Sequence, residues 1–517
     1  MSEQTPSPLA PIEPRLRWLL PADLYVAAWI DPSTANLTRV FEHLRTLQHV
    51  LYDYIPREVA QAMVQPAAEP TTWQEGTLMF TDLAGFTPLF ESFAVYGRAG
   101  AEALHKVLNE YFSQMIATVS KSGGNLLEFT GDAMLIQFPR QQHQNDAAMA
   151  IRAGLRMQRA MQQFAVIETA QHTLSLNMRI GLHRGRFLSA NIGTPRRMEY
   201  VLLGRVVQQT KRAEASSKIG RVNISQTVAD QVTEQFRLEP SVPGYHFVVD
   251  DFTDEQLGEY DISLKRRRMV GGILLDRSTA GVIEAIDDVL QRTEQLASYL
   301  PRPVLTLLVE SAADRKLRPE FTDLTVMFVN LTGVPGAADQ APPGEEYALI
   351  DALSRAFALI NAAVEAQGGV LKNVSCDYIG SSMLIYFGVP NAHTNDSLRA
   401  AAAALTIRRV AMEHGPAIAG DTGISISCQI GLARGPVFAA EIGEPRGRRE
   451  LNILGDIVNT AARLMSNAKS NQILITEPMY NEIAHSFRCE PLPPMALKGK
   501  AVPVRLYALH DWLEQSR

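Results

Sequence analysis

The chain has 517 residues, of which 46% are hydrophobic and 20% charged, with a formal net charge of -6 at pH 7. This is globular composition with length for two or three domains, and the negative charge argues against a nucleic-acid or anionic-membrane surface. Three irregularly spaced cysteines argue against a disulfide framework or a CxxC metal site, so a reducing, cytoplasmic location is expected. No signal peptide is recognised, and no run of about 18 apolar residues predicts a membrane span.

The N-terminal part, residues 1–70, is predicted to be a disordered segment followed by a helix. Its first fifteen residues are polar and rich in proline, which is typical of disorder. Residues 35–66 have the apolar spacing of a helix, and so do residues 281–298. These two helices could pair as coiled dimerisation helices or pack on their own domains, and the sequence leaves both alternatives open.

Residues 71–250 are predicted to form an α/β domain. A short apolar strand, "GTLMF", is followed by a helical stretch that ends at the paired glycines Gly123 and Gly124. The segment "NLLEFTGDAMLIQF" predicts a strand, a Gly-Asp turn and a second strand. A helix, the strand "LSLNMRIGLHRG" and the helix "VVQQTKRAEAS" follow, so antiparallel hairpins alternate with helices.

The same order of elements recurs at residues 319–512, after a linker and helix at 251–318. "FTDLAGFT" (80–87) recurs as "FVNLTGVP" (328–335), and "RIGLHRG" (179–185) recurs as "QIGLARG" (429–435). Three further blocks match in the same order, among them "YIPREV" (54–59) with "YLPRPV" (299–304). Matched blocks at a nearly constant offset far above 50 residues indicate one duplicated domain and exclude a solenoid.

Two aspartates of the first copy lie where strands are predicted to end. Asp82 precedes the small residues Ala84 and Gly85, and Asp132 lies in the hairpin turn. If adjacent strands bring these turns together, two carboxylates face one cavity and suit Mg²⁺ or Mn²⁺, while the glycine turn exposes N–H groups to phosphate. The alternative for a single turn aspartate is local capping. The second copy has Asn330 and Ser381 at the matching positions, so it cannot build this metal site.

A complementary difference is found further along. The second copy carries Asn459 and Arg463 four residues apart on one predicted helical face, where they could hold a sugar oxygen and a phosphate. The first copy has Gln208 and Arg212 there. An exposed polar helix face is the simpler alternative for the pair. If the two copies pack head to tail, one composite site receives both carboxylates and the Asn/Arg pair.

As a set, these motifs resemble the class III nucleotidyl cyclases, and the tandem arrangement is most similar to that of soluble adenylyl cyclases. "FTDLAGFT" and "EFTGDAML" look like the two metal motifs of the family, and "GDIVNTAARL" looks like its transition-state motif. The resemblance implies two ferredoxin-like α/β cyclase domains that form an intramolecular pseudo-heterodimer. It also implies two Mg²⁺ or Mn²⁺ ions on Asp82 and Asp132, with ATP or GTP as the partner.

The resemblance also assigns residues to the substrate. Asn459 would position the ribose and Arg463 would stabilise charge on the α-phosphate. The other residues assigned to substrate binding are Arg179, Phe86, Thr87, Lys498 and Lys500, of which Arg179 and either lysine match phosphate-binding positions of the family.

The purine pocket departs from the family pattern, in which a lysine pairs with an Asp or Thr. The nearest matches here are Asp377 and Asn452, whose hydrogen-bonding groups suit either adenine or guanine. Adenylate cyclase is the preferred interpretation. Guanylate cyclase and a catalytically inactive nucleotide-binding or scaffold protein are the alternatives. At the second, degenerate site, Glu128 replaces the lysine that binds bicarbonate in soluble adenylyl cyclases, while Arg212 is retained, so activation by bicarbonate is not expected.

Overall fold

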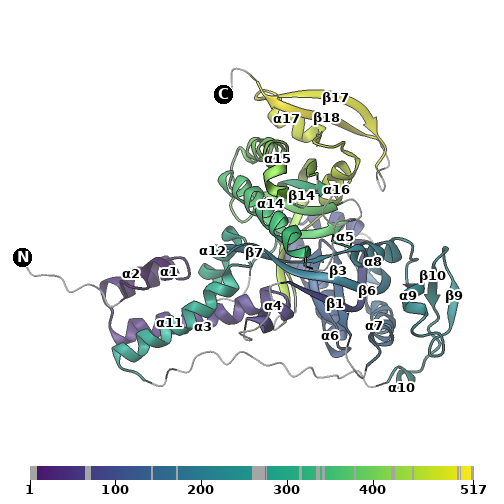
Figure 1. The fold of residues 1–517 in the computed structure, drawn as a ribbon, viewed down its shortest axis with the longest axis horizontal. Coiled ribbons are helices and arrows are strands. Elements are labelled where there is room, and N and C mark those ends of the chain that lie inside the picture. Colours follow the sequence, from purple (N-terminus) through teal and green to yellow (C-terminus); the bar gives the residue numbers. More distant parts are fainter. Residues whose placement is uncertain are drawn as a thin grey trace, which may run out of the picture.

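The computed structural model describes residues 9–513 except 64–70, 141–143, 170–172, 259–273, 275, 314–316, 333–337, 340–343, 378–379, 421–424, 445–446, 498–499 and 501; residues 376–377 and 417–419 are described by their backbone alone. Two mixed α/β domains lie against each other, and a pair of long helices extends to one side of them (Figure 1).

The first domain is built on an eight-stranded sheet with the order β2-β3-β1-β6-β8-β10-β9, and β7 pairs with β6. All pairs are antiparallel except β6 with β8. The strands are β1 (Thr71–Ala84), β2 (Asn125–Thr130), β3 (Ala133–Pro139), β6 (Asn177–Thr194), β7 (Arg197–Leu203), β8 (Val222–Ser225), β9 (Leu238–Pro240) and β10 (Tyr245–Val248); β4 (Ile167–Glu168) and β5 (Thr173–Leu174) form a separate ribbon.

The second domain repeats this topology strand for strand. Its order is β12-β13-β11-β14-β16-β18-β17, with β15 on β14, and β14 and β16 are the parallel pair. The duplication predicted from the sequence is therefore confirmed at the level of sheet topology. The strands are β11 (Glu320–Thr332), β12 (Val370–Asp377), β13 (Gly380–Phe387), β14 (Ser427–Gly443), β15 (Arg449–Leu454), β16 (Ile473–Thr476), β17 (Phe487–Met495) and β18 (Val504–Trp512).

Helices cover the sheets with apolar faces that the sequence spacing provides. In α6 (Gly97–Lys121), Leu104, Leu108 and Met115 recur on one face and are fully buried. The helix ends before Gly123, whose φ of 81° lies in the left-handed region. The other helices of the two domains are α5 (Phe86–Ala94), α7 (Asp146–Ala160), α8 (Arg205–Ala215), α9 (Gln226–Ala229), α10 (Asp254–Leu257), α14 (Glu346–Ala366), α15 (Asp396–Ala419), α16 (Asp456–Asn467) and α17 (Glu477–Ile483).

The long helices α3 (Thr34–Tyr54) and α11 (Thr279–Ala297) lie side by side (Figure 1). Their first residues, Thr34 and Thr279, have hydroxyl oxygens 3.3 Å apart, so the helices run parallel. Each helix thus finds a partner within the chain, ahead of the domain that it leads into. The shorter helices α1 (Glu13–Leu16), α2 (Ala22–Ile30), α4 (Arg57–Ala62) and α12 (Arg302–Ser311) complete this region.

The disorder expected at the N-terminus does not extend through residue 15. Leu9, Ile12 and Leu16 are buried in one apolar cluster with α3 and α11. Polar and proline-rich composition suggested disorder, but every third or fourth residue here is apolar and packs on the helix pair. Residues 1–8 lie outside the described part of the chain.

Helix α14 is the one described helix that is long and apolar enough to cross a membrane by length and composition. More than half of its most apolar window, 56%, is buried inside the protein, where Leu349, Leu353 and Phe357 join the largest apolar cluster. This is the pattern of a core helix.

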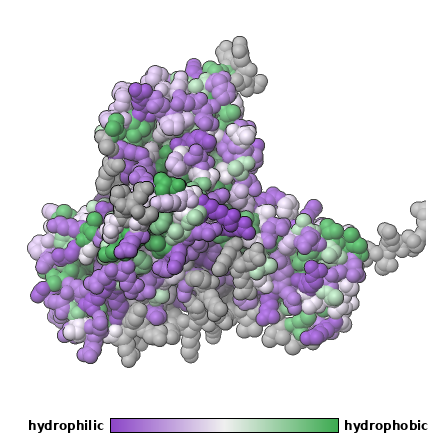
Figure 2. Space-filling view, turned by 180° about the vertical axis from the view of Figure 1, so that it is seen from behind, coloured by the Kyte–Doolittle hydropathy of each residue, from purple (hydrophilic) through white to green (hydrophobic). Residues whose placement is uncertain are grey.

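Hydrophilic residues cover most of the molecular face in Figure 2, with apolar residues in scattered groups.

Two arginines, one from each domain, bind the ends of the long helices α3 and α11. Arg448 of the second domain donates to the carbonyl oxygen of Tyr54, the last residue of α3, at 2.6 Å. Arg197 of the first domain donates to the carbonyl oxygen of Tyr299, just beyond α11, at 3.3 Å. Each arginine also pairs with the glutamate two residues on, at 3.0 and 2.8 Å. Each domain therefore holds the helix that leads into the other domain.

Candidate functional site

The pairing of two central strands positions the first predicted site residues. Asp82 near the end of β1 lies opposite Arg179 on β6, and the Arg179 guanidinium is ion-paired with the Asp82 carboxylate. Arg179 Nε also lies 3.1 Å from Oε1 of the buried Glu214 on α8. Arg179, predicted to bind phosphate, is thus held between two carboxylates. Glu214 was not among the site residues predicted from the sequence.

Asp132 is close to this group because β3 pairs with β1. The last paired residues are Thr81 and Met134, so the turn before β3 comes beside Asp82. Burial, and next the charge of Asp82, raises the pKa of Asp132 to about 7. The structure therefore brings together the two carboxylates that the sequence paired.

This donor set fits a hard divalent cation. Three carboxylates and one guanidinium meet here, so the cluster carries excess negative charge, and a cation would lower the pKa of Asp132 by stabilising its ionised form. The hydroxyl of Tyr111, fully buried and under the field of both aspartates, has no hydrogen-bond partner. Among the described residues no three carboxylate, histidine or cysteine side chains are placed to share one metal ion, so Glu214 adds negative charge and a pairing partner for Arg179, and is not counted as a third ligand. A bound ion would complete its coordination with phosphate or water oxygens.

The loop after Asp82 forms a helix N-terminus without a side-chain cap. Gly85 has a φ of 97°, and a Cβ there would lie 2.3 Å from the carbonyl oxygen of Ser175, so only glycine fits. The first N–H groups of α5 are left for an anion. The side chain of Phe86 is buried in the core, so only its backbone is available, whereas Thr87 is exposed.

The predicted transition-state pair lies on α16, one helical turn apart. Asn459 is exposed, and Nη1 of Arg463 is buried without a hydrogen-bond partner. An unpaired buried guanidinium N–H is costly unless a ligand accepts from it. Lys500 is ion-paired with Asp456 at the start of the same helix. Lys498 lies outside the described residues.

The residues predicted to contact the purine are placed differently. Asn452 on β15 is fully buried; its Nδ2 donates to the carbonyl oxygen of Gly131 at 2.6 Å, and its Oδ1 accepts from the backbone N–H of Ile453 at 3.0 Å. The side chain of Asp377 lies outside the described residues. The hairpin register makes Asn373 the counterpart of Glu128, because they pair with Leu384 and Leu135 at matching positions. The purine roles of Asp377 and Asn452 stay predictions.

The equivalent site in the second domain has lost its charges together. Asn330 takes the place of Asp82 and donates to Oε1 of Gln429, which takes the place of Arg179, at 2.8 Å. Ser381 replaces Asp132 and is fully buried, and Met465 replaces Glu214. A charged network has become a neutral one with the same strand pairing.

Glu128 fills its surroundings with hydrogen bonds. Its carboxylate accepts from Asn373 at 2.5 Å, from Ser375 at 2.9 Å and from Thr130 at 3.1 Å, and burial raises its pKa. A cavity of about 80 Å³ lies beside it between the domains. None of the described residues proposed to bind metal or phosphate lines this cavity.

The family model "Adenylate and Guanylate cyclase catalytic domain" matches residues 69–245 and 318–511. The chain belongs to this family. Its two sheets are class III cyclase domains in tandem, as predicted.

The relatives of these cyclase domains include both nucleotide classes. Adenylate cyclase type 10 of Mus musculus is 24% identical over 487 residues, 88% of this chain and 27% of that protein. Receptor-type guanylate cyclase gcy-13 of Caenorhabditis elegans is 24% identical over 212 residues, 40% of this chain and 20% of that protein. The chain thus spans about a quarter of the length of the curated relatives that it matches.

Among solved structures, a class III adenylyl cyclase-like ATP-binding protein from Pseudomonas aeruginosa shares the fold. The TM-score is 0.53 at 13% identity, with 85% of this chain and 92% of that chain covered. This likeness extends across both domains, so it concerns the tandem arrangement as well as the single domain.

Proposed function

We propose that this chain is an adenylate cyclase that converts ATP to 3′,5′-cyclic AMP and pyrophosphate at one composite site between its two domains. The proposal depends most on one observation: Asn452 of the second domain contacts Gly131, the neighbour of Asp132. Helix α16, with Asn459 and Arg463, begins four residues after Asn452. The metal carboxylates and the Asn/Arg pair therefore belong to neighbouring surfaces.

In this proposal, Asp82 and Asp132 would hold two Mg²⁺ or Mn²⁺ ions, which when bound would supply positive charge next to the ribose 3′-hydroxyl and the triphosphate. Asn459 orients the ribose so that its 3′-oxygen lies in line with the α-phosphorus. A new bond forms between these atoms, the bond from the α-phosphorus to the bridging oxygen breaks, and pyrophosphate leaves with that electron pair. The hydroxyl proton passes to solvent. Arg463 Nη1 donates to the α-phosphate as negative charge develops there.

The remaining cations of the site are held by carboxylates in this structure. Arg179 pairs with Asp82 and Glu214, and Lys500 pairs with Asp456. A nucleotide with its metal ions would compete for both pairs, because the metal takes Asp82 and the phosphates offer the cations new partners. The backbone N–H groups of Phe86 and Thr87 would contact the phosphates at the start of α5.

A direct assay tests this function. Purified protein is incubated with Mn²⁺ or Mg²⁺ and with ATP or GTP separately, and cyclic nucleotides are separated and quantified. We expect cyclic AMP from ATP at a rate that exceeds cyclic GMP formation. Cyclic GMP as the main product would make this a guanylate cyclase. No cyclic product with either nucleotide and either metal would contradict the proposal.

The second candidate is a nucleotide-binding protein without cyclase activity. The observation in its favour is that both expected phosphate-binding cations, Arg179 and Lys500, already have protein partners. Equilibrium binding of a nonhydrolysable ATP analogue separates the two candidates. Tight binding without turnover of ATP supports the inactive protein, and turnover excludes it.

A cytoplasmic location remains a prediction from the composition.

A further inference from the structure

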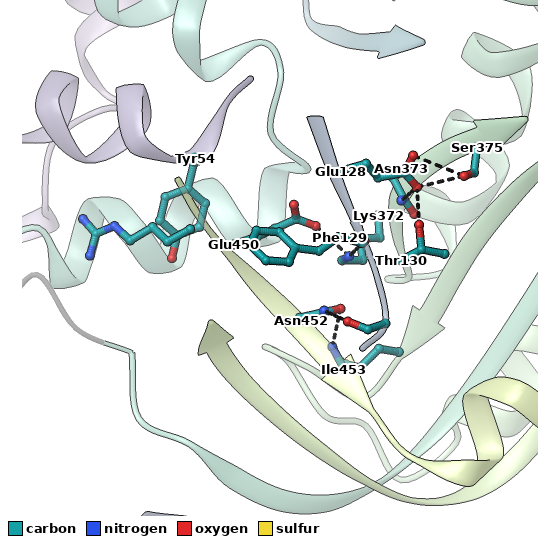
Figure 3. Close-up of polar contacts among 12 residues, drawn as sticks. Tyr54, Glu128, Phe129, Thr130, Lys372, Asn373, Ser375, Glu450, Asn452 and Ile453 are labelled. Atoms are coloured by element: carbon teal, nitrogen blue, oxygen red, sulfur yellow. Dashed lines mark hydrogen bonds and ion pairs between the residues drawn. The ribbon is translucent and has the colours of Figure 1, made fainter. Parts of the chain in front are cut away.

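The hairpin that carries Asp132, here called the metal hairpin (β2 and β3), is held from outside by the second domain. Lys372 on β12 donates from Nζ to the carbonyl oxygen of Phe129 at 3.0 Å. Asn452 donates to the carbonyl oxygen of Gly131 at 2.6 Å. Lys372 is 7% exposed and Asn452 is 0% exposed, so neither bond competes with bulk water. Figure 3 shows both donors beside the strand that carries Phe129.

The residues at the corresponding positions of the first domain, Leu127 and Val201, cannot make these two contacts. Lys372 is the extra residue of a bulge in β12, between Leu371 and Asn373. The same bulge in β2 contains Leu127, between Leu126 and Glu128. The side chain of leucine has no donor, so the second domain receives no such bond from this position.

The same holds for the asparagine. Asn452 pairs with Ala440 in the second domain, and Val201 pairs with Ala190 at the corresponding position of the first. Valine cannot donate to a carbonyl oxygen. At these two positions, donors are therefore present only against the hairpin that carries Asp132. The hairpin that carries Ser381 is held by a different residue of the first domain, the buried Arg197, whose Nη2 donates to the carbonyl oxygens of Leu371 and Lys372 at 3.3 and 3.4 Å.

A chain of charged contacts connects Lys372 to helix α3. Lys372 Nζ lies 2.6 Å from Oε1 of Glu450, and Arg448 Nη2 lies 3.0 Å from the other oxygen of that glutamate. Arg448 Nη1 in turn donates to the carbonyl oxygen of Tyr54, where α3 ends. Figure 3 shows Tyr54, Glu450 and Lys372 in a row that leads to the metal hairpin. A shift of the end of α3 would therefore displace Arg448, Glu450 and Lys372 in sequence.

We propose that Lys372 and Asn452 are positioning residues that fix the metal hairpin so that Asp132 faces Asp82, and that Glu450 and Arg448 make this position depend on helix α3. The inference rests on the proposed cyclase function for its effect on turnover, but not for its effect on the hairpin. A misplacement of a reacting group by about 1 Å costs roughly 100-fold in rate, so two main-chain bonds beside Asp132 are enough to matter.

The test replaces each donor with the residue that the other domain carries. Lys372→Leu and Asn452→Val remove one donor each, and the matched control is Val201→Ala, at the position of the first domain that corresponds to Asn452. Hydrogen exchange of residues 125–139 and the affinity for Mn²⁺, measured by electron paramagnetic resonance without nucleotide, are the readouts that need no turnover. The kcat and KM for ATP and GTP are measured in addition.

We expect the two donor variants to raise amide exchange in the metal hairpin and to weaken Mn²⁺ binding about fivefold or more. The kcat should fall about tenfold while KM changes less than threefold. Lys372→Arg should restore the Mn²⁺ affinity, because arginine keeps both the donor and the charge. The control Val201→Ala should leave exchange and Mn²⁺ affinity within about twofold of the unmodified protein.

Other results would overturn the inference. Unchanged exchange and Mn²⁺ affinity in folded Lys372→Leu and Asn452→Val would do so whether or not the protein turns over ATP. If Lys372→Leu does not fold, Asn452→Val decides alone. A change in the ATP to GTP preference of Asn452→Val, with hairpin exchange unaltered, would assign Asn452 to the purine instead. Arg448→Gln should raise exchange in the metal hairpin as well as in α3; a change confined to α3 would remove the link to that helix.

Discussion

The two domains share one topology, yet only the first builds a charged cluster at the end of its central strands. Asp82 and Arg179 face each other across β1 and β6, whereas Asn330 and Gln429 face each other across β11 and β14. The exchange keeps a hydrogen bond in each place and removes both charges at once. An unpaired buried charge is strongly destabilising, so replacing both partners of the ion pair together removes the charges without leaving one of them unpaired.

The largest expected effect comes from breaking this difference at Asp82. Asp82→Ala removes a ligand of the proposed metal ions and should reduce cyclic nucleotide formation at least about 1,000-fold, because the proposal assigns to these ions both the activation of the nucleophile and the neutralisation of the phosphates. Asn330→Ala, at the corresponding position, should keep activity within about threefold. Initial rates with Mn²⁺ measure both, and thermal unfolding checks that each variant is folded. An equal loss from both variants would contradict a single active site.

The second largest effect is expected from Arg463 on α16, which is compared with its counterpart on α8. Arg463→Ala should lower kcat about 100- to 1,000-fold with a small change in KM, because its partnerless Nη1 would bind charge that develops only in the transition state. Arg212→Ala, its counterpart on α8, should change kcat less than threefold. Steady-state kinetics in both substrates measure this. A loss that appears in KM alone would move Arg463 from catalysis to ground-state binding.

A third difference between the domains is a buried histidine on the long strand of the first sheet, which the second sheet lacks at the corresponding position. Burial lowers the pKa of His183 on β6 to about 4, and Ala433 occupies the corresponding place on β14. The unfolded chain takes up this proton near pH 6.5 and the folded chain near pH 4. The stabilising contribution is therefore complete above pH 6.5 and is lost as the pH falls towards 4.

His183→Ala should remove this acid sensitivity. Between pH 7 and pH 4.5 the unmodified protein should lose about 2 kcal/mol more unfolding free energy than the variant, if other groups titrate alike. Urea unfolding at both pH values measures the difference. Parallel losses in the two proteins would show that His183 takes up a proton in the folded state near its ordinary pKa.

The smallest expected effect is that of bicarbonate. Glu128 occupies the place expected to bind this anion, and its carboxylate already accepts from Asn373, Ser375 and Thr130. We expect added bicarbonate to change the rate less than twofold at constant pH and ionic strength, with chloride as the control. A stimulation of several-fold would show that the anion finds another site or that Glu128 can be displaced.

Much of the fold could be predicted because the repeated sequence blocks indicate a duplicated domain. Matching blocks in one order implied two similar domains. The end of the strand that carries Asp82 and the turn at Asp132 followed from local patterns of burial and turn residues. The composition of the first fifteen residues misled because three apolar residues among prolines gave too short a pattern to predict packing on α3 and α11.

The contacts that cross between domains could not be predicted in the same way. Lys372 and Phe129 are 243 positions apart, and the bond goes to a main-chain carbonyl, which leaves no trace in the choice of residue at position 129. The second hairpin is four residues longer than the first, so counting back from Phe387 gives Asp377 as the counterpart of Glu128, whereas the strand pairing gives Asn373. Glu214 had one available signal: its place is Met465 in the repeat, a loss that parallels that of Asp82.

The crossed arginines have the geometry of an isologous interface. In a twofold dimer, residue i of one subunit contacts residue j of the other and the reverse holds as well. Arg448 with Tyr54 and Arg197 with Tyr299 satisfy that rule within a single polypeptide. The two domains are thus symmetric in the arginine contacts at the ends of α3 and α11. They differ at the end of their central strands, where only the first domain carries charged residues. Separate expression of either half would leave its helix end without the arginine that caps it, so the two halves depend on each other like the subunits of an obligate dimer.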